Sequence, residues 1–280
     1  MKNKTLRIGL WMIAIILSML GTIYLVAWKS PQYYKLEKIS VSKDSIVPFH
    51  DYGAYANHPR PFIVEGENFV IVGAPHTRNP KNPDLRLVHQ KWNRLKPTIA
   101  LVEGRLGFLI PYVMDPVKQL GEGGFVKKLA NKDGVPVYSW DLSKESLAVA
   151  LQDSFSREQI ALGQILNPYF SNLRFGKPAS PENYIQPFLK RAAYVGQEAG
   201  FKNAGDVDLA WKKYFPQGPD WRDVSDEKEL PGYLSFMMAA SNDLRNRHLV
   251  GVVKELTAKN EKVFLLCGSS HAFCVSPAFR

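Results

Sequence analysis

The chain has little cysteine: Cys267 and Cys274 are the only two among its 280 residues. Neither a C-x-x-C pair nor a cysteine–histidine zinc-finger spacing is present, which argues against a structural zinc site. The two cysteines bracket His271, and two alternatives stay open for them. They form a disulfide that closes this loop in an oxidising compartment, or one is a core residue and the other a loop residue.

The sequence also lacks a block of basic residues, although it is basic overall. Its net charge is +10, but the cations are scattered, and the densest doublets are Lys127-Lys128 and Lys212-Lys213. A nucleic-acid interface would need a basic stripe with interleaved aromatic residues. We therefore expect no nucleic-acid partner, because scattered charge is typical of a solvated surface that faces anionic lipid or envelope polymer.

Charge is missing altogether from Ile8 to Ala27, and three cations precede this run. Twenty helical residues at about 1.5 Å each span a hydrocarbon core of about 30 Å. The preceding cations favour a cytoplasmic N-terminus. We predict an uncleaved signal anchor within residues 1–28, because the apolar run is long for a signal peptide and no small-x-small cleavage site precedes Trp28. The rest of a single-pass protein would then be extracytoplasmic, in the periplasm or at the cell surface if the chain is bacterial.

The remaining sequence divides into a tether and one domain. Residues 29–60 are polar, aperiodic and rich in Tyr and Pro, which predicts a tether to a domain at 61–280. Apolar strand-like runs separated by helix-length segments predict an α/β fold, a mainly parallel sheet with flanking helices. The predicted strands are 61–64, 69–72, 98–102, 135–140 and 263–267, and the predicted helices are 84–95, 125–131, 143–170 and 232–259. Residues 142–232 contain no convincing strand and predict a helical insertion over the sheet, with 216–226 as its most mobile loop.

Two copies of a Gly-x-x-His signature follow predicted strands. They are Gly73-Ala74-Pro75-His76 and Gly268-Ser269-Ser270-His271. Residues just past the carboxyl ends of parallel strands line the crevice where ligands bind. A glycine there allows a sharp turn, and a histidine three positions on can project over the crevice. One copy alone is more typical of a histidine bound by a backbone carbonyl, but two copies at equivalent strand ends favour a shared site.

Three carboxylates are candidates for the same crevice. Glu103 ends the apolar strand 98–102, where it could ligate a divalent cation, act as a general base, or simply be solvated. Asp141 has the same placement, although an Asp there also caps a following helix. Glu122 lies in a Gly121–Gly124 stretch that lacks the Walker lysine-serine ending. We interpret that stretch as a flexible loop and Glu122 as a weaker candidate.

One arginine stands out on the late predicted helix. At about 100° per residue, Arg245 falls in the middle of the apolar stripe, whereas Asp243 and Arg247 point the opposite way as surface residues. A buried unpaired charge is strongly disfavoured. Arg245 therefore extends to solvent or pairs with an anion or carboxylate. His248 on the same face is expected in the core, and Asn246 at the stripe's edge could donate a hydrogen bond into the crevice.

These motifs occur in one order along the chain: Gly73-x-x-His76, Glu103, Arg245-Asn246 and Gly268-x-x-His271. In this order the chain resembles the TraB/Tiki-type superfamily, which also embraces erythromycin esterase-like and ChaN-like proteins. The likeness runs from about Phe62 to Ala272 and rests on these four short motifs. It implies an α/β core with pseudo-duplicated halves and a site formed by both Gly-x-x-His loops.

The resemblance also implies a chemistry for the site. It suggests a membrane-anchored hydrolase: a metal-dependent peptidase in the Tiki branch, or an enzyme with histidine-activated water in the esterase branch. His76, Glu103 and His271 would hold a divalent metal ion or activate water. Arg245 and Asn246 would stabilise the charge that develops on a peptide or small-molecule substrate. Only one glutamate follows the first histidine at a persuasive position, so the metal ligand set is incomplete.

Two other functions compete with this one. A serine hydrolase would use Ser270 in the strand-end stretch Gly268–Ala272, but its order requires an acid and then a histidine after the nucleophile. No Asp or Glu follows Ser270, which excludes that arrangement. The second alternative is a non-catalytic, membrane-tethered module that binds haem or a peptide, as relatives in the same superfamily include a haem-binding branch.

Overall fold

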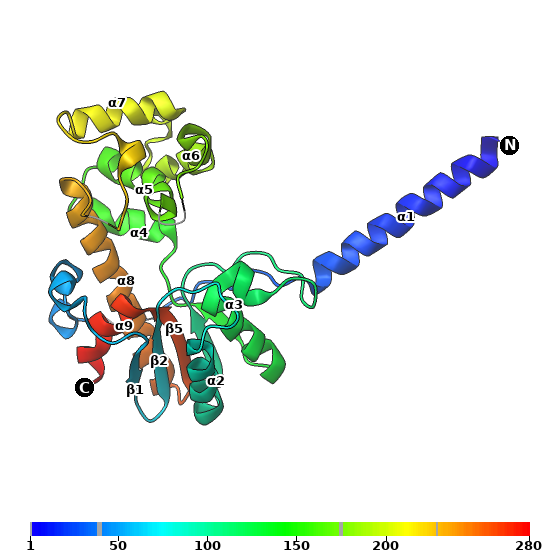
Figure 1. Cartoon of the computed structure of the whole chain (residues 1–280), viewed down its shortest axis with the longest axis horizontal. Helices are drawn as coiled ribbons and strands as arrows, with labels where there is room; N and C mark the ends of the chain where they lie inside the picture. The colour runs from blue at the N-terminus through cyan, green and yellow to red at the C-terminus, as the bar shows by residue number, and fades with distance from the viewer. Residues whose placement is uncertain (1, 38–40, 174–175, 228) are drawn as a thin grey trace.

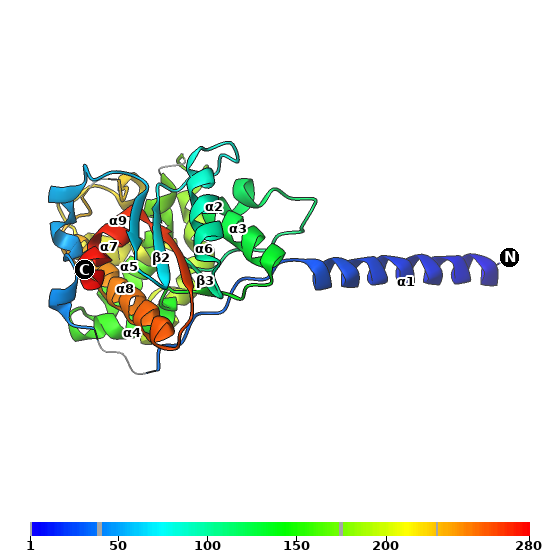
Figure 2. The ribbon, with the colours of Figure 1, turned by 90° about the horizontal axis from the view of Figure 1, so that it is seen from below.

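The N-terminal helix stands apart from the rest of the molecule. A computed structural model of the chain describes residues 2–37, 41–173, 176–227 and 229–280, with backbone alone at 2–10, 20, 23 and 26. Its first element, α1 (Lys2–Val26), extends away from the α/β domain (Figures 1 and 2). Counting only described side chains, none of the helices is both long and apolar enough to cross a membrane. In the predicted span 8–27, the side chains at 8–10, 20, 23 and 26 lie outside the described part.

The described chain forms one five-stranded sheet. Its strands are β1 (Phe62–Glu65), β2 (Phe69–Ala74), β3 (Ile99–Val102), β4 (Val137–Ser139) and β5 (Val263–Gly268). They lie in the order β1-β2-β5-β3-β4, and β1 alone is antiparallel to its neighbour. The predicted α/β fold with a mainly parallel sheet is confirmed, and its first two strands form an antiparallel hairpin. The last strand of the sequence occupies the middle of the sheet.

Helices cover both faces of this sheet. Alternate side chains of the central strands point to opposite faces, as the period of two requires. Ile71, Leu101 and Leu265 pack against α8 (Tyr233–Ala258) and α9 (Ser269–Val275). Their neighbours along each strand pack against α2 (Asp84–Leu95) and α3 (Pro116–Asp133), which lie side by side in Figure 2. Burial on both faces explains why these strands are continuous apolar runs in the sequence.

The glycine-rich stretch around Glu122 is helical, so the prediction of a flexible loop there is wrong. It lies inside α3, which begins at Pro116, well before the predicted start at 125. The helix is kinked at Gly121, whose φ of 63° only glycine adopts without strain. Glu122 is 4% exposed.

The described residues of the predicted insertion are mostly helical and contain no strand, as predicted, but the helices differ in detail. It contains α4 (Lys144–Ala150), α5 (Arg157–Asn172), α6 (Pro181–Leu189) and α7 (Ala204–Tyr214). These lie beyond the carboxyl ends of the parallel strands, beside the first half of α8 (Figure 1). The single helix predicted over 143–170 is two helices, because Ser156 and Gln159 form a capping box that starts α5.

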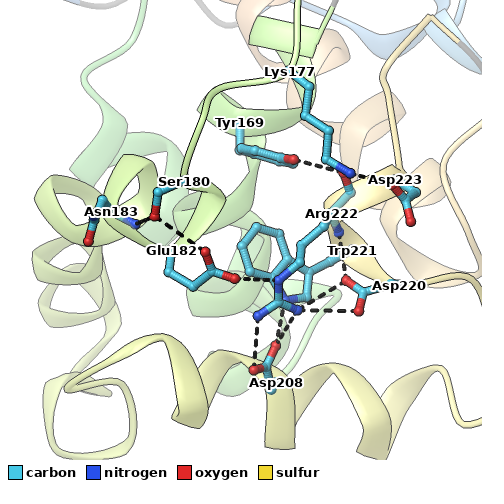
Figure 3. A network of polar contacts seen from close by, with 10 residues as sticks. All are labelled: Tyr169, Lys177, Ser180, Glu182, Asn183, Asp208, Asp220, Trp221, Arg222 and Asp223. Atoms are coloured by element: carbon cyan, nitrogen blue, oxygen red, sulfur yellow. Dashed lines mark hydrogen bonds and ion pairs between the residues drawn. The ribbon is translucent and has the colours of Figure 1, made fainter.

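The loop predicted as mobile, 216–226, is anchored at its centre. Trp221 begins a short 3-10 helix and is 1% exposed. Beside it, Arg222 bonds to the carboxylates of Asp208, Glu182 and Asp220 at 2.6–3.1 Å (Figure 3). This Arg222 network joins α6, α7 and the loop, which explains why the loop is held.

The described parts of the predicted tether, residues 29–37 and 41–60, are in contact with the domain. The backbone of Ser139, in β4, exchanges two 2.8 Å hydrogen bonds with Gln32 and Tyr34. The Tyr34 hydroxyl donates to Glu255 on α8 at 2.9 Å. The folded unit therefore begins before Phe62, and the segment covers the edge of the sheet that β4 would otherwise expose.

Candidate active site

The sheet topology brings the predicted site residues to one edge. His76 follows β2, Glu103 follows β3, Asp141 follows β4 and His271 lies in α9 directly after β5. These strands are parallel neighbours, so their carboxyl ends meet at the same edge. Arg245 reaches this edge from α8. The structure thus gathers residues that lie up to 195 positions apart in the sequence, from His76 to His271.

The glycines of the two Gly-x-x-His motifs interlock. A Cβ on Gly73 would lie 2.6 Å from Ala272 Cβ and 2.9 Å from Ser269 Cα, both in the second motif's helix. A Cβ on Gly268 would lie 2.7 Å from Nε2 of His76, the histidine of the first motif. The Ser269 hydroxyl also donates to the Gly73 carbonyl at 2.8 Å. Each motif needs its glycine because the other motif occupies the space of a side chain.

His76 is held in an uncommon backbone conformation. Its φ is 65°, in the left-handed region that non-glycine residues rarely adopt, and its side chain is exposed. The following residue, Thr77, donates its backbone N–H to Oε1 of the buried Glu122 at 2.6 Å. Glu122 therefore fixes the loop that carries His76. Such strain is kept where the surrounding structure requires it, and it clusters at functional sites.

All five N–H donors of Arg245 are used inside the protein. Nε and Nη2 form a fork on Asp141 at 2.8 and 3.1 Å, and Nη2 also donates to Glu103 at 2.8 Å. Nη1 donates to Asn242 Oδ1 at 3.0 Å and to Nε2 of His271 at 3.1 Å. Of the two alternatives for Arg245, pairing with carboxylates is the one observed. No N–H of Arg245 is left to bind a substrate directly.

This arrangement fixes the charge of Glu103. Burial alone would raise the pKa of its carboxyl. The charge and hydrogen bond of Arg245, together with the nearby His271 and His76, outweigh burial, and the pKa lies well below its usual range. The other carboxylate oxygen, Oε2, accepts from the backbone N–H of Gly268 at 2.9 Å. The pKa of Arg245 is raised: burial opposes its charge, but Asp141 and Glu103 favour it more strongly. Glu103 is therefore an ionised carboxylate at neutral pH.

The hydrogen bonds of His271 define its tautomer. Arg245 can only donate, so Nε2 of His271 accepts, and the ring proton lies on Nδ1. Nδ1 then donates to Oδ1 of Asn246, 2.6 Å away. Burial first, and the charge of Arg245 second, lower the pKa of His271 to about 4. His271 is neutral, and its only lone pair is already bound.

Asn246 therefore lies behind the histidine instead of at the crevice where it was expected. It is fully buried, and its Nδ2 is a buried donor without a hydrogen-bond partner in the described part of the chain. Leaving a donor unpaired costs free energy, about 1–3 kcal/mol. Arg245 fixes this orientation of the Asn246 amide. Because Arg245 donates to Nε2 of His271, the ring proton is on Nδ1, and Asn246 must present its oxygen to that proton.

Trp140 supports the same pair, and no feature of the sequence analysis pointed to it. Its ring is fully buried, 5.4 Å from the His271 ring and 5.3 Å from the guanidinium carbon of Arg245. Its Nε1 donates to the Leu266 carbonyl at 3.0 Å, and its own carbonyl contacts Nδ1 of His248 at 2.7 Å. His248 is half-buried and bound to a backbone carbonyl, so it has the structural role predicted for it but lies at the margin of the core.

The outward side of α8 is less exposed than expected, since Asp243 and Arg247 are both half-buried. Asp243, predicted to be a surface residue, is half-buried and accepts the backbone N–H of Phe49 at 2.7 Å. Asp243 and Arg247 line a separate cavity of about 530 Å³. The two cysteines, Cys267 and Cys274, are both buried and free, so the disulfide alternative is not realised.

Two of the three side chains proposed as metal ligands, Glu103 and His271, are already engaged. Both oxygens of Glu103 and Nε2 of His271 bind Arg245 or Gly268. The described residues contain no group of three His, Cys, Asp or Glu side chains arranged to hold a metal ion. A divalent cation between Glu103 and His271 would have to displace the guanidinium or lie against its charge. The donor set does not fit a metal in this arrangement.

The part of the site open to solvent is small. The side chains of Arg245, Asp141 and His271 are 12%, 4% and 6% exposed, but Glu103 is 28% exposed and His76 is exposed. A ligand that arrives from solvent therefore meets His76 and Glu103, with the other residues behind them. The chain has no significant match among family models, curated proteins or solved structures.

Proposed function

We propose that the chain is a membrane-anchored hydrolase of peptide or ester bonds, in which His76 activates a water molecule beside the carboxylate of Glu103. The observation that carries this proposal is the exposed imidazole of His76, held in a strained backbone next to a carboxylate that Arg245 keeps ionised. An anionic neighbour stabilises the imidazolium that forms when a histidine takes a proton. The resemblance to the TraB/Tiki-type superfamily supports the same reaction class.

The residues have distinct parts in this reaction. His76 takes a proton from water as its oxygen attacks the carbonyl carbon, and later gives that proton to the leaving group. Glu103 stabilises the positive charge on His76 between these steps. Arg245 and His271 have no free donor or lone pair, so they act by position: they hold Glu103 in place and keep it charged.

The proposal includes an N-terminal anchor formed by residues 8–27, with the domain outside the cytoplasm. The uncharged run of the sequence and the helical backbone of α1 support it. The large apolar side chains described along α1, such as Trp11, Leu17 and Leu25, are 70%, 62% and 78% exposed, and the helix does not pack on the domain. Such surface is unfavourable in water and favourable in lipid.

A His76→Gln variant tests the catalytic role. Because His76 is exposed, the fold should be kept, while kcat/KM should fall by about a hundredfold or more with the loss of the general base. The measurement is turnover of a panel of p-nitrophenyl esters and short peptides, with circular dichroism as a fold check. His89→Gln, at another exposed histidine, is the matched control. Full activity in the His76 variant would rule out this mechanism.

Chelation tests whether the reaction uses the divalent metal that the resemblance implies. Since Arg245 already binds Glu103 and His271, two of the three proposed ligands, we expect activity to persist in EDTA, and elemental analysis of the purified chain to find less than one equivalent of metal. A chelator-sensitive activity that one divalent cation restores would favour the metal-dependent alternative, and the guanidinium would then have to move.

A binding module without turnover is the second candidate, and one observation favours it. Arg245, the residue expected to stabilise developing charge, has no donor left for a substrate oxyanion. If no substrate of the panel is turned over, titration with haem and with peptides separates the two functions. In a binder, Glu103→Gln should leave the affinity nearly unchanged, whereas a catalyst should lose its turnover.

A further inference from the structure

The segment between β3 and α3 exposes apolar side chains at its tip. From Leu106 to Met114 it contains no charged residue. Phe108, Tyr112 and Val113 are 54%, 106% and 78% exposed. Single exposed apolar residues are common on soluble domains, but three in one short loop mark a surface that meets another apolar phase.

This loop, residues 105–115, is folded and anchored. Leu106 and Leu109 are 8% and 0% exposed, so its base is part of the domain core. At the tip, Met114 donates its backbone N–H to the Ile110 carbonyl at 3.0 Å, which closes a helical turn. The apolar side chains at the tip therefore project outward from a structured base, not from a loose strand of chain.

The loop is joined to the end of α1. The backbone N–H of Trp28 donates to the Leu109 carbonyl at 2.8 Å, and the Ser30 hydroxyl donates to the Leu106 carbonyl. Ala27, directly after the helix, is buried here. Figure 1 shows the segment before α3 reaching the point where α1 leaves the domain. The exposed loop tip and the apolar helix therefore share one side of the molecule.

The residues around this junction suit a membrane interface. Tyr24 and Tyr112 are exposed aromatic side chains, a type enriched where hydrocarbon meets water. Lys29, Arg105 and Lys118 are exposed cations on the same segments. Cations next to a membrane helix are attracted to anionic phospholipid headgroups. Both the apolar tip and the flanking charge thus match a lipid surface.

We propose that the loop of residues 105–115 is a membrane-contacting surface, in which Phe108, Tyr112 and Val113 enter the interface of an anionic phospholipid bilayer. The bilayer is the one that α1 spans, so this inference rests on the anchor in the proposed function. Glu103 lies two residues before the loop, and the contact holds the site close to the membrane. The substrate class that follows is a molecule displayed at the membrane surface.

Depth-dependent quenching tests the proposal with the full-length chain. The protein is reconstituted in vesicles of phosphatidylcholine and phosphatidylglycerol, with a polarity-sensitive fluorophore on Tyr112→Cys. Both native cysteines are buried, and labelling of the parent chain gives the background. Trp11→Cys reports on α1, and Leu209→Cys, 71% exposed on α7, is the control. We expect the Tyr112 label to emit at shorter wavelength and to be quenched several-fold more by nitroxide lipid than the Leu209 label.

The outcomes separate the loop from the anchor. If the Trp11 label is quenched and the Tyr112 label behaves like that on Leu209, the loop proposal is overturned and the anchor stands. If only the Tyr112 label is quenched, the loop contact holds and the anchor fails. Absence of quenching at both positions overturns both. A Tyr112 signal that shifts with protein density but ignores nitroxide lipid indicates docking to another copy of the chain, which also overturns the proposal.

Discussion

Two arginines organise two regions of this molecule in different ways. Arg245 joins segments that are distant in sequence, since Glu103 and Asp141 lie 142 and 104 positions from it. Arg222 joins carboxylates within the insertion, which lie 2, 14 and 40 positions away. The first network closes the α/β domain around its strand ends, whereas the second holds a local cluster of helices together (Figure 3).

The surroundings of the two networks differ as much as their span. Arg245 and Asp141 are 12% and 4% exposed, whereas Arg222 is 23% exposed and its partner Asp220 is 52% exposed. Solvent screens the Arg222 pairs, so each contributes little to stability. Around Arg245 the charges are removed from water, and an unpaired one would be costly. Similar ion pairs therefore have different consequences. The Arg222 pairs hold helices together, whereas the Arg245 pairs set the charge of the carboxylate in the candidate site.

Loss of the guanidinium at the site should have the largest effect. Arg245→Met leaves the buried Asp141 and the partly exposed Glu103 without their counter-charge, so we expect the free energy of unfolding to fall by about 3–5 kcal/mol. Arg245→Lys restores the charge but not the planar fork, and should recover part of the stability without the activity. Urea unfolding and the substrate panel measure both. Arg247→Lys, on the outward side of the same helix, is the control and should stay within about 0.5 kcal/mol; equal effects at the two positions would contradict the assigned role.

Acid should weaken the site before it weakens the insertion. Because burial and Arg245 lower the pKa of His271 to about 4, the unfolded chain binds a proton between pH 6.5 and 4 that the folded chain does not. This stability is present above about pH 6.5 and is lost as the pH falls toward 4, by up to about 3 kcal/mol. Unfolding free energies measured across this range should show a smaller slope for His271→Gln. An unchanged slope would mean that the buried imidazole is not the group responsible.

The smallest effect is expected in the Arg222 network. Arg222→Lys loses the fork to Asp208 but keeps the charge, and its partners are partly solvated, so we expect a loss of about 1 kcal/mol and unchanged turnover. High salt should reduce the difference from the parent chain, since exposed pairs are screened. A loss as large as that of Arg245→Met, or a loss of activity, would remove the distinction between the two regions.

The sequence predicts the sheet well because hydrophobic periodicity is a local signal. Each buried strand is a continuous apolar run, and the helices from 84 and 232 end within a residue or so of their predicted limits. The wrong predictions lie where two local signals in the sequence conflict. Four residues that include three glycines concealed the helix around Glu122, although Asp115 and Pro116 carry the usual signs of a helix start.

The site is only partly predictable, for a physical reason. Arg245 could be found because a charge in an apolar stripe is anomalous by itself. Trp140 and Asn242 carry no such anomaly, since an indole or an amide is common in many settings, and only the fold shows that both contact Arg245. The position of Asn246 behind His271 depends on side-chain directions that a helical wheel does not resolve.

The place of β5 in the sheet bears on how the protein is made. Its partners β2 and β3 are synthesised first, yet they cannot pair with each other, because residues 263–268 lie between them. Until the last part of the chain is available, the sheet exists at most as two separate pairs, β1–β2 and β3–β4. Contacts of such long sequence separation slow folding, since the chain must close long loops first. A chain that ends before Val263 would lack the centre of its sheet, and with it His271 and the backbone N–H of Gly268 that binds Glu103.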